Sequence, residues 1–87
     1  MTPVYTSRFK KDLRLASSRQ KNMDKIKAII TALLDGKVLP QKLRDHSLTG
    51  NYQGRRECHI EFDWLLIYKL DGDRIIFERT GSHADLF

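Results

Sequence analysis

Residues 46–64, HSLTGNYQGRRECHIEFDW, bring together side chains that can exchange protons and bind anions. His46 and His59 lie in this stretch, and the third histidine, His83, lies near the C-terminus. The charged residues that could act beside these histidines are Arg55, Arg56, Asp63 and Arg79. Residues 1–45 contain no histidine. This distribution indicates one site, assembled from the C-terminal half of the chain.

This set of side chains suits RNA cleavage without a metal better than it suits other reactions. Such cleavage needs a base for the 2′-OH proton, an acid for the leaving 5′-oxygen, and cations to stabilise the phosphorane. Imidazole titrates near neutral pH and guanidinium stays charged, so histidine and arginine meet these needs. Aromatic side chains could hold bases by stacking. The candidates for stacking are Tyr52, Trp64, Tyr68 and Phe87, although Trp64 and Tyr68 could equally be core residues.

Taken singly, these residues also have ordinary structural explanations. His59 can be an exposed strand residue, Asp63 a turn residue, and His83 a solvated residue of the tail. The chain has no P-loop, Rossmann glycine pattern or Gly-x-Ser-x-Gly motif, and no Cys and His spacing typical of zinc. Cys58 and His59 are strand neighbours that face opposite ways, which argues against Cys58 as a nucleophile.

A short strand and two helices are expected before this region. The strand candidate is VYT, residues 4–6, and Ser7 can cap the helix that follows it. The buried stripe of this helix consists of Phe9, Leu13 and Ala16. A second helix, apolar on one face, is expected over residues 22–35, and Gly36 suits a left-handed C-cap.

A loop and three strands are expected in the remainder. Residues 37–53 are rich in turn-forming residues and predict a loop with one helical turn near 41–44. The strands are residues 54–61, 64–70 and 74–80, with a tight hairpin at the Asp-Gly-Asp of 71–73. The order predicts a single α+β domain, a small sandwich with helices on one face of the sheet. The other face is then open or covered by a partner.

Strand alternation predicts where the candidate side chains point. Cys58 and Ile60 lie on one face of their strand, and Glu57, His59 and Glu61 lie on the other. Arg79 shares its alternation with the apolar residues Ile75 and Phe77. We therefore expect Arg79 to enter the site from a strand end.

The charge balance favours a polyanionic partner. The 87 residues carry a formal net charge of +5 and a sequence pI near 9.6, so nucleic acid is the leading partner, ahead of an acidic protein or anionic lipid. The single cysteine suits a reducing cytoplasm. The N-terminal segment lacks an apolar signal region, and AIITALL is far too short to span a membrane.

Several motifs together resemble the YafQ branch of the RelE/ParE toxin superfamily. These are DHSLTG, the RRECHI strand, DWLLIY and ERTGSHADLF, and the similarity covers essentially the whole chain, residues 1–87. The resemblance implies a RelE-like fold and a ribosome-dependent endoribonuclease that cuts mRNA in the ribosomal A site and inhibits translation. It also implies a bacterial cytoplasmic toxin that is neutralised by a cognate antitoxin, contacts operator DNA only through the antitoxin complex, and needs no metal or other cofactor.

The resemblance also assigns residues. The catalytic positions it implies are His46, His59, Asp63, Arg79, His83 and Phe87. His83 would be the general acid, His46, His59 or Asp63 would share the base role, Arg79 would hold the scissile phosphate, and Phe87 would stack on a nucleotide. The RNA-binding candidates are Trp64, Arg55, Arg56, Lys10, Lys11 and Arg14.

The sequence leaves open the role of one surface and two rival functions for the domain. The basic face of the first helix, with Lys10, Lys11, Arg14, Arg19 and Lys21, is either a solvated surface or a docking site for rRNA. The domain could be a ParE-like toxin that acts only by binding, as in gyrase inhibition. It could also be a basic RNA-binding module without catalysis. The complete set of His, Asp and Arg residues favours cleavage.

Overall fold

The structure is a computed structural model that describes all residues, Met1 to Phe87. Helix α1 (Ser7–Ser18) begins at Thr6, whose hydroxyl accepts a hydrogen bond from the Phe9 amide at 3.0 Å. The predicted cap at Ser7 is therefore wrong by one residue. Helix α2 (Met23–Leu34) is capped by Asn22, and Gly36 follows it at φ +72°, in the left-handed conformation that the sequence predicts.

One five-stranded sheet, in the order β1-β5-β4-β3-β2, organises the chain. The predicted meander is confirmed as β3 (Arg56–Glu61), β4 (Trp64–Asp71) and β5 (Arg74–Gly81), all antiparallel. Strand β1 (Thr2–Tyr5) pairs in parallel with β5, and both helices lie in the connection from β1, at one edge of the sheet, to β2 at the other. The fold is the α+β sandwich expected from the sequence.

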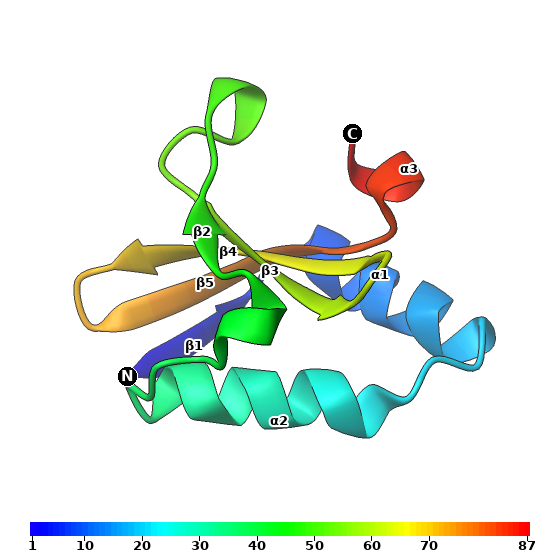
Figure 1. Ribbon diagram of the computed structural model, residues 1–87, viewed down its shortest axis with the longest axis horizontal. Coiled ribbons are helices and arrows are strands. Elements are labelled where there is room, and N and C mark those ends of the chain that lie inside the picture. The colour runs from blue at the N-terminus through cyan, green and yellow to red at the C-terminus, as the bar shows by residue number, and fades with distance from the viewer.

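The two faces of the sheet are covered differently. Helices α1 and α2 lie on one face, and they bury a core with the strands that includes Phe9, Ile26, Leu66 and Phe77. The opposite face carries the segment around β2 and the C-terminal helix α3 (His83–Leu86), which stand apart from α2 in Figure 1. There a smaller cluster forms from Leu65, Ile67 and Leu86, with Leu48 and Tyr52 packed against it.

The region expected as a loop contains three short elements. A 3-10 turn, η1 (Gln41–Leu43), falls where one helical turn was expected. Strand β2 (His46–Ser47) and a second turn, η2 (Gly50–Tyr52), were not predicted, because elements of two or three residues are too short to show a periodic pattern. No helix has the length and apolar character needed to cross a membrane.

Candidate active site

Pairing between strands places the histidines on the face opposite the helices. His46 lies across from Glu57, Glu57 from Ile67, and Ile67 from Arg79, so these side chains form one row over β2, β3, β4 and β5. Residues directly opposite in a sheet share a face. In the neighbouring row His59 lies across from Leu65. Leu65 and Ile67 belong to the cluster under α3, so both rows lie on the face of the sheet opposite the helices, which we call the open face.

A β-bulge turns Arg79 toward this face. Tyr68 pairs with Phe77 and the next residue, Ile67, pairs with Arg79, which leaves Glu78 as the extra residue of β5. The expectation that Arg79 shares the alternation of Ile75 and Phe77 is therefore wrong.

A second bulge corrects the position predicted for Glu61. The register shifts between His59 and Glu61, and Glu61 pairs with Trp64 of the helix-covered core. Its carboxylate binds Lys21 at 3.3 Å and Lys25 at 2.9 Å, and these hydrogen bonds hold its pKa below the usual value. Glu61 therefore ties the second helix to the sheet and does not share the face of His59.

Cys58 faces the core, as the alternation predicts. The side chain is fully buried, and burial raises the pKa of its thiol to about 12. A thiol in this environment is not a thiolate near neutral pH, so the structure supports the argument against a Cys58 nucleophile.

Glu57 is the site residue that the sequence analysis did not identify. It is 5% exposed, and its Oε2 lies 3.3 Å from His46 Nε2 and 3.6 Å from His59 Nε2. Its other oxygen, Oε1, is buried without a hydrogen-bond partner. The alternation did place Glu57 beside His59, but it could not show that β2 would bring His46 to the same carboxylate.

Asp63 and His83 form a second pair at the end of the sheet. Asp63 Oδ1 accepts hydrogen bonds from the His83 backbone N–H at 2.8 Å and from the ring Nδ1 at 2.6 Å. The backbone bond, followed by the ring bond, holds the pKa of Asp63 below its usual value. Because a carboxylate only accepts, Nδ1 carries the proton and Nε2 is left to act elsewhere.

Helix α3 holds His83 in position. Ser82 and Asp85 form a capping box, and Arg19 binds Asp85 at 2.7 Å, which brings the pKa of Asp85 to about 2. The spacing Ser82-x-x-Asp85 was a sequence signal for this short helix. The C-terminal segment, expected to be a solvated tail, is therefore a short helix that an ion pair joins to Arg19 at the end of α1.

The aromatic and imidazole rings form a continuous series across the open face. Ring centroids are 6.4 Å apart for His46 and His59, 5.8 Å for His59 and His83, and 6.4 Å for His83 and Phe87. Phe87 meets Tyr52 edge-on at 5.4 Å. The structure thus brings together the predicted residues His46, His59, Asp63, His83 and Phe87.

Arg79 lies at the edge of this site. It makes two hydrogen bonds to Asp12 of α1, from Nε at 2.8 Å and from Nη2 at 3.3 Å, and no direct contact with a histidine. The Asp12 hydrogen bond raises the pKa of the guanidinium against the effect of burial, with a smaller contribution from Tyr52. The side chain is 15% exposed and its one ion pair is with Asp12 through Nε and Nη2, so Nη1 is the nitrogen that remains for an anion.

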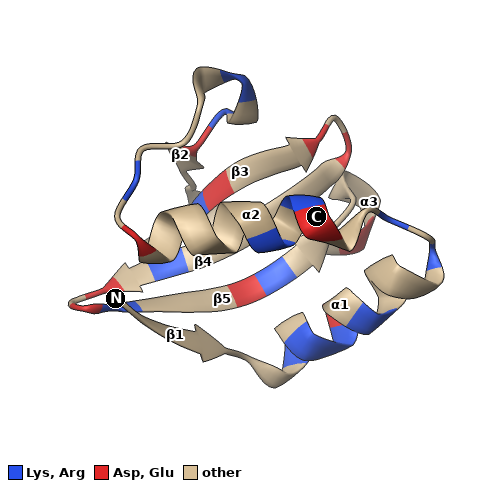
Figure 2. Cartoon of the chain, turned by 90° about the horizontal axis from the view of Figure 1, so that it is seen from below, with Lys and Arg blue, Asp and Glu red and all other residues tan.

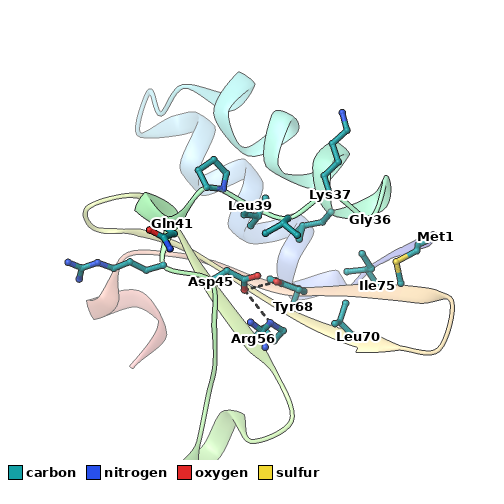
Figure 3. Close-up of a pocket in the computed structure, with 14 residues that line it drawn as sticks. Met1, Gly36, Lys37, Leu39, Gln41, Asp45, Arg56, Tyr68, Leu70 and Ile75 are labelled. Atoms are coloured by element: carbon teal, nitrogen blue, oxygen red, sulfur yellow. Dashed lines mark hydrogen bonds and ion pairs between the residues drawn. The ribbon is translucent and has the colours of Figure 1, made fainter.

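Two predicted RNA-binding residues, Trp64 and Arg56, lie on the helix-covered face of the sheet and not on the face of the histidines. Trp64 is 1% exposed and donates from Nε1 to Thr80 at 2.9 Å, so its ring cannot stack on a base. Arg56 turns toward the other side of the sheet, where it meets Asp45 beside Tyr68 (Figure 3). The Trp64 assignment is therefore wrong, because core packing uses its ring, whereas the Arg56 assignment stays a prediction for a side chain that lies away from the histidines. Tyr68, the other doubtful stacking candidate, is also buried.

The other basic candidates differ in whether they form ion pairs. Arg55 is paired with Glu78 at 2.6 Å. Lys10, Lys11 and Arg14 are exposed and have no ion-pair partner, and Figure 2 shows Lys and Arg gathered along α1. The two remaining cations of the predicted basic face are engaged, since Arg19 binds Asp85 and Lys21 binds Glu61.

The chemistry available to this site is proton transfer beside a bound anion. Two imidazoles share a carboxylate, a third imidazole is oriented by another carboxylate, and a guanidinium lies at the margin. No three His, Cys, Asp or Glu side chains are arranged to hold a metal ion. This combination provides an acid, a base and charge stabilisation for a phosphodiester.

Comparison with known proteins identifies the family. The family model described as bacterial toxin of type II toxin-antitoxin system, YafQ, matches residues 1–87. The mRNA interferase toxin YafQ of Escherichia coli K12 is 45% identical over 84 residues, which cover 95% of this chain and 91% of that protein. The crystal structure of YafQ from E. coli BL21(DE3) matches with a TM-score of 0.94 at 43% identity, covering 98% of this chain and 96% of that one. The toxin in a crystal structure of the E. coli DinJ-YafQ complex matches with a TM-score of 0.91 at 44% identity, with the same coverage of both chains. This chain therefore belongs to the YafQ family of toxins of type II toxin-antitoxin systems.

Proposed function

We propose that this protein is an mRNA interferase, an endoribonuclease that cuts mRNA in the ribosomal A site by general acid-base catalysis and so inhibits translation. The observation that carries the proposal is the pairing of Asp63 with His83 next to the Glu57 carboxylate that His46 and His59 share. These units lie side by side, with the rings of His59 and His83 5.8 Å apart. Two proton-transfer groups at this spacing can serve the two ends of one phosphodiester reaction.

His83 is the general acid in this proposal. Asp63 fixes the ring through Nδ1, which leaves Nε2 to protonate the leaving 5′-oxygen. The ring is about half exposed, which leaves room for substrate. Asp63 is then the orienting group, in the way that a carboxylate orients the histidine of a hydrolytic triad.

We assign the base role to His59, with Glu57 as a positioning residue. Both ring nitrogens of His46 already face acceptors, Nε2 the Glu57 carboxylate and Nδ1 the Arg44 carbonyl, so His46 has no free nitrogen to take up the 2′-OH proton. His59 meets Glu57 through Nε2, which leaves Nδ1 to accept that proton while the carboxylate stabilises the imidazolium that forms. His46 then holds Glu57 from its other side.

Arg79 and the aromatic residues bind the substrate. The free edge of Arg79 can hold a phosphate oxygen while Asp12 fixes the guanidinium. Phe87 is 64% exposed and can stack on a base, backed by Tyr52. Because Arg79 lies apart from the histidines, the site depends on a substrate that spans both, which is consistent with RNA presented in a fixed conformation by the ribosome.

The partners follow from charge and family. The unpaired cations Lys10, Lys11 and Arg14 dock the toxin on rRNA, through phosphate contacts that do not read sequence. A cognate antitoxin with an acidic, partly disordered segment folds onto the basic surface. The DinJ-YafQ complex of a relative supports this pairing. We place the protein in the bacterial cytoplasm, where ribosomes are available, and expect it to reach operator DNA only within the antitoxin complex.

The deciding experiment is primer extension on a defined mRNA in a purified translation system, with and without ribosomes. It compares the wild type, His83→Ala and the control Lys27→Ala, an exposed residue of α2. We expect new 5′ ends within codons that need both ribosomes and His83, and equal cleavage by Lys27→Ala. Inhibition of growth without any cleavage would contradict the proposal and favour a toxin that acts by binding, such as a gyrase inhibitor.

A further inference from the structure

A hollow that includes neither Tyr52 nor Phe87 borders His59 and His83. Its volume is about 590 Å³, within the range of small-molecule pockets. Its lining residues are Lys42, Leu43, Arg44, His59, Ile60, Glu61, Phe62 and His83. Among them, the side chains of Lys42, Arg44 and Phe62 have no role in the catalytic arrangement described above; Arg44 enters that arrangement only through its backbone carbonyl.

Phe62 is exposed to an unusual degree for a large apolar side chain. It lies in the turn between β3 and β4 and is 93% exposed, so it contributes almost nothing to the core. A turn at this point requires no aromatic residue. An aromatic face that is free of protein contacts, next to Asp63 and on the rim of the hollow, is a platform on which a base can stack.

The two cations of the hollow are free. Most arginines near the site are engaged by carboxylates, as Arg55 is by Glu78 and Arg79 by Asp12. Lys42 and Arg44 are exposed and form no ion pair. Arg44 is also linked to the catalytic row, because its carbonyl oxygen lies against Nδ1 of His46. Unpaired cations beside a catalytic histidine favour an anionic ligand.

The single carboxylate that lines the hollow, that of Glu61, does not prevent the binding of an anion. Glu61 is held by Lys21 and Lys25, so its charge is already compensated. The net charge presented to a ligand is therefore positive.

We infer that this hollow is a nucleotide subsite for single-stranded RNA, in which Phe62 stacks on a base while Lys42 and Arg44 contact backbone phosphate. A separate hollow of about 440 Å³ is lined by Thr49, Asn51, Tyr52, Leu86 and Phe87. The two hollows share no residue, and His83 borders one while its ring lies 6.4 Å from Phe87 of the other. An RNA strand that occupies both passes its scissile phosphate across the histidines, with an aromatic platform on each side.

This inference rests on the proposed function and adds a determinant of which sequences are cut. Phe62 belongs to the hollow and not to the acid-base groups, so its identity sets how a neighbouring base is held. Replacement of the ring therefore changes both the rate and the choice of cleavage sites.

The test measures the rate of each cut on a defined mRNA carried by programmed ribosomes. Phe62→Ala removes the platform, Phe62→Trp keeps one, and Val38→Ala is the control, because Val38 is 96% exposed and lies outside both hollows. Loss of one stacked base is worth about 1 to 3 kcal/mol, so we expect Phe62→Ala to slow cleavage about 5- to 150-fold and redistribute the cuts. Phe62→Trp should restore the rate, and melting temperatures should not change.

A second experiment measures how cleavage on ribosomes depends on salt concentration, for the wild type and for the double variant Lys42→Ala/Arg44→Ala. Each lost phosphate contact should reduce the slope of log activity against log salt by about 0.7. Wild-type rates and cut sites in Phe62→Ala would overturn the subsite while leaving the proposed function intact, as would a loss that Phe62→Trp fails to restore. A wild type that cuts nothing would overturn the proposed function, and the subsite with it.

Discussion

The two faces of the sheet differ in how completely their polar groups are satisfied. On the helix-covered face Trp64 donates to Thr80, and Thr80 donates in turn to the Leu65 carbonyl at 2.6 Å. On the open face Glu57 Oε1 is the one buried side-chain oxygen or nitrogen without a partner. A buried polar group in that state costs about 1 to 3 kcal/mol.

Under the proposed function, this contrast separates stability from activity within one sheet. The covered face supplies the core, and the open face keeps charged and ionisable groups that would be better solvated elsewhere. Proteins retain such groups where function requires them. Substitutions on the covered face should therefore alter folding, and those on the open face should alter cleavage.

The largest effect is expected from His59→Ala on the open face. Loss of an acid-base group lowers the rate by about 10²- to 10⁴-fold, while a partly exposed side chain contributes about 1 kcal/mol or less to folding. Primer extension and thermal unfolding on the same preparation measure the two quantities. A folded, fully active His59→Ala would break the assignment of this face to catalysis.

The converse result is expected from Phe77→Ala on the covered face. Phe77 is 0% exposed, and deleting such a ring costs about 3 to 5 kcal/mol of unfolding free energy. Denaturant unfolding measures the loss, and Phe77→Leu provides a milder change of about 1 kcal/mol. Cleavage per folded molecule of Phe77→Leu should equal that of the wild type; a large fall would mean that the two faces are coupled.

A smaller effect on activity is expected from Glu57→Gln. The change removes a buried charge but keeps the shape, so the melting temperature should stay the same or rise. Cleavage should fall about tenfold, because His46 and His59 lose the carboxylate that positions and stabilises them. Unchanged cleavage with a raised melting temperature would show that Glu57 has no part in the reaction.

The smallest effect concerns the anchoring of α3. The Arg19 hydrogen bond brings the pKa of Asp85 from 3.8 to about 2, so ionised Asp85 stabilises the fold above about pH 4 and the contribution is lost as pH falls toward 2. We expect the melting temperature of the wild type to fall more steeply over that range than that of Asp85→Asn. Parallel curves would show that this pair does not stabilise the tail.

The general plan of the molecule follows from patterns along the chain. Alternation at Cys58 and His59 correctly assigned their faces, and the helical stripe of α2 with Gly36 located that helix. These features are predictable because each depends on residues a few positions apart. The structure brings the three histidines that cluster in the sequence to one face of the sheet.

The errors arise where distant residues interact. The positions of Arg79 and Glu61 depend on β-bulges, which are defined by the partner strand and leave no mark in the alternation. Trp64 looks available for stacking in the sequence, but its ring is buried in the core.

The sequence by itself determined the elements, their order and the chemical types present at the site, because local periodicity and residue chemistry are properties of short segments. Only the tertiary structure decided that β2 brings His46 to Glu57, that Asp63 orients His83, and that Asp12 holds Arg79 at the margin. These contacts join segments separated by up to 67 residues. They depend on strand register and loop closure, which no local pattern specifies.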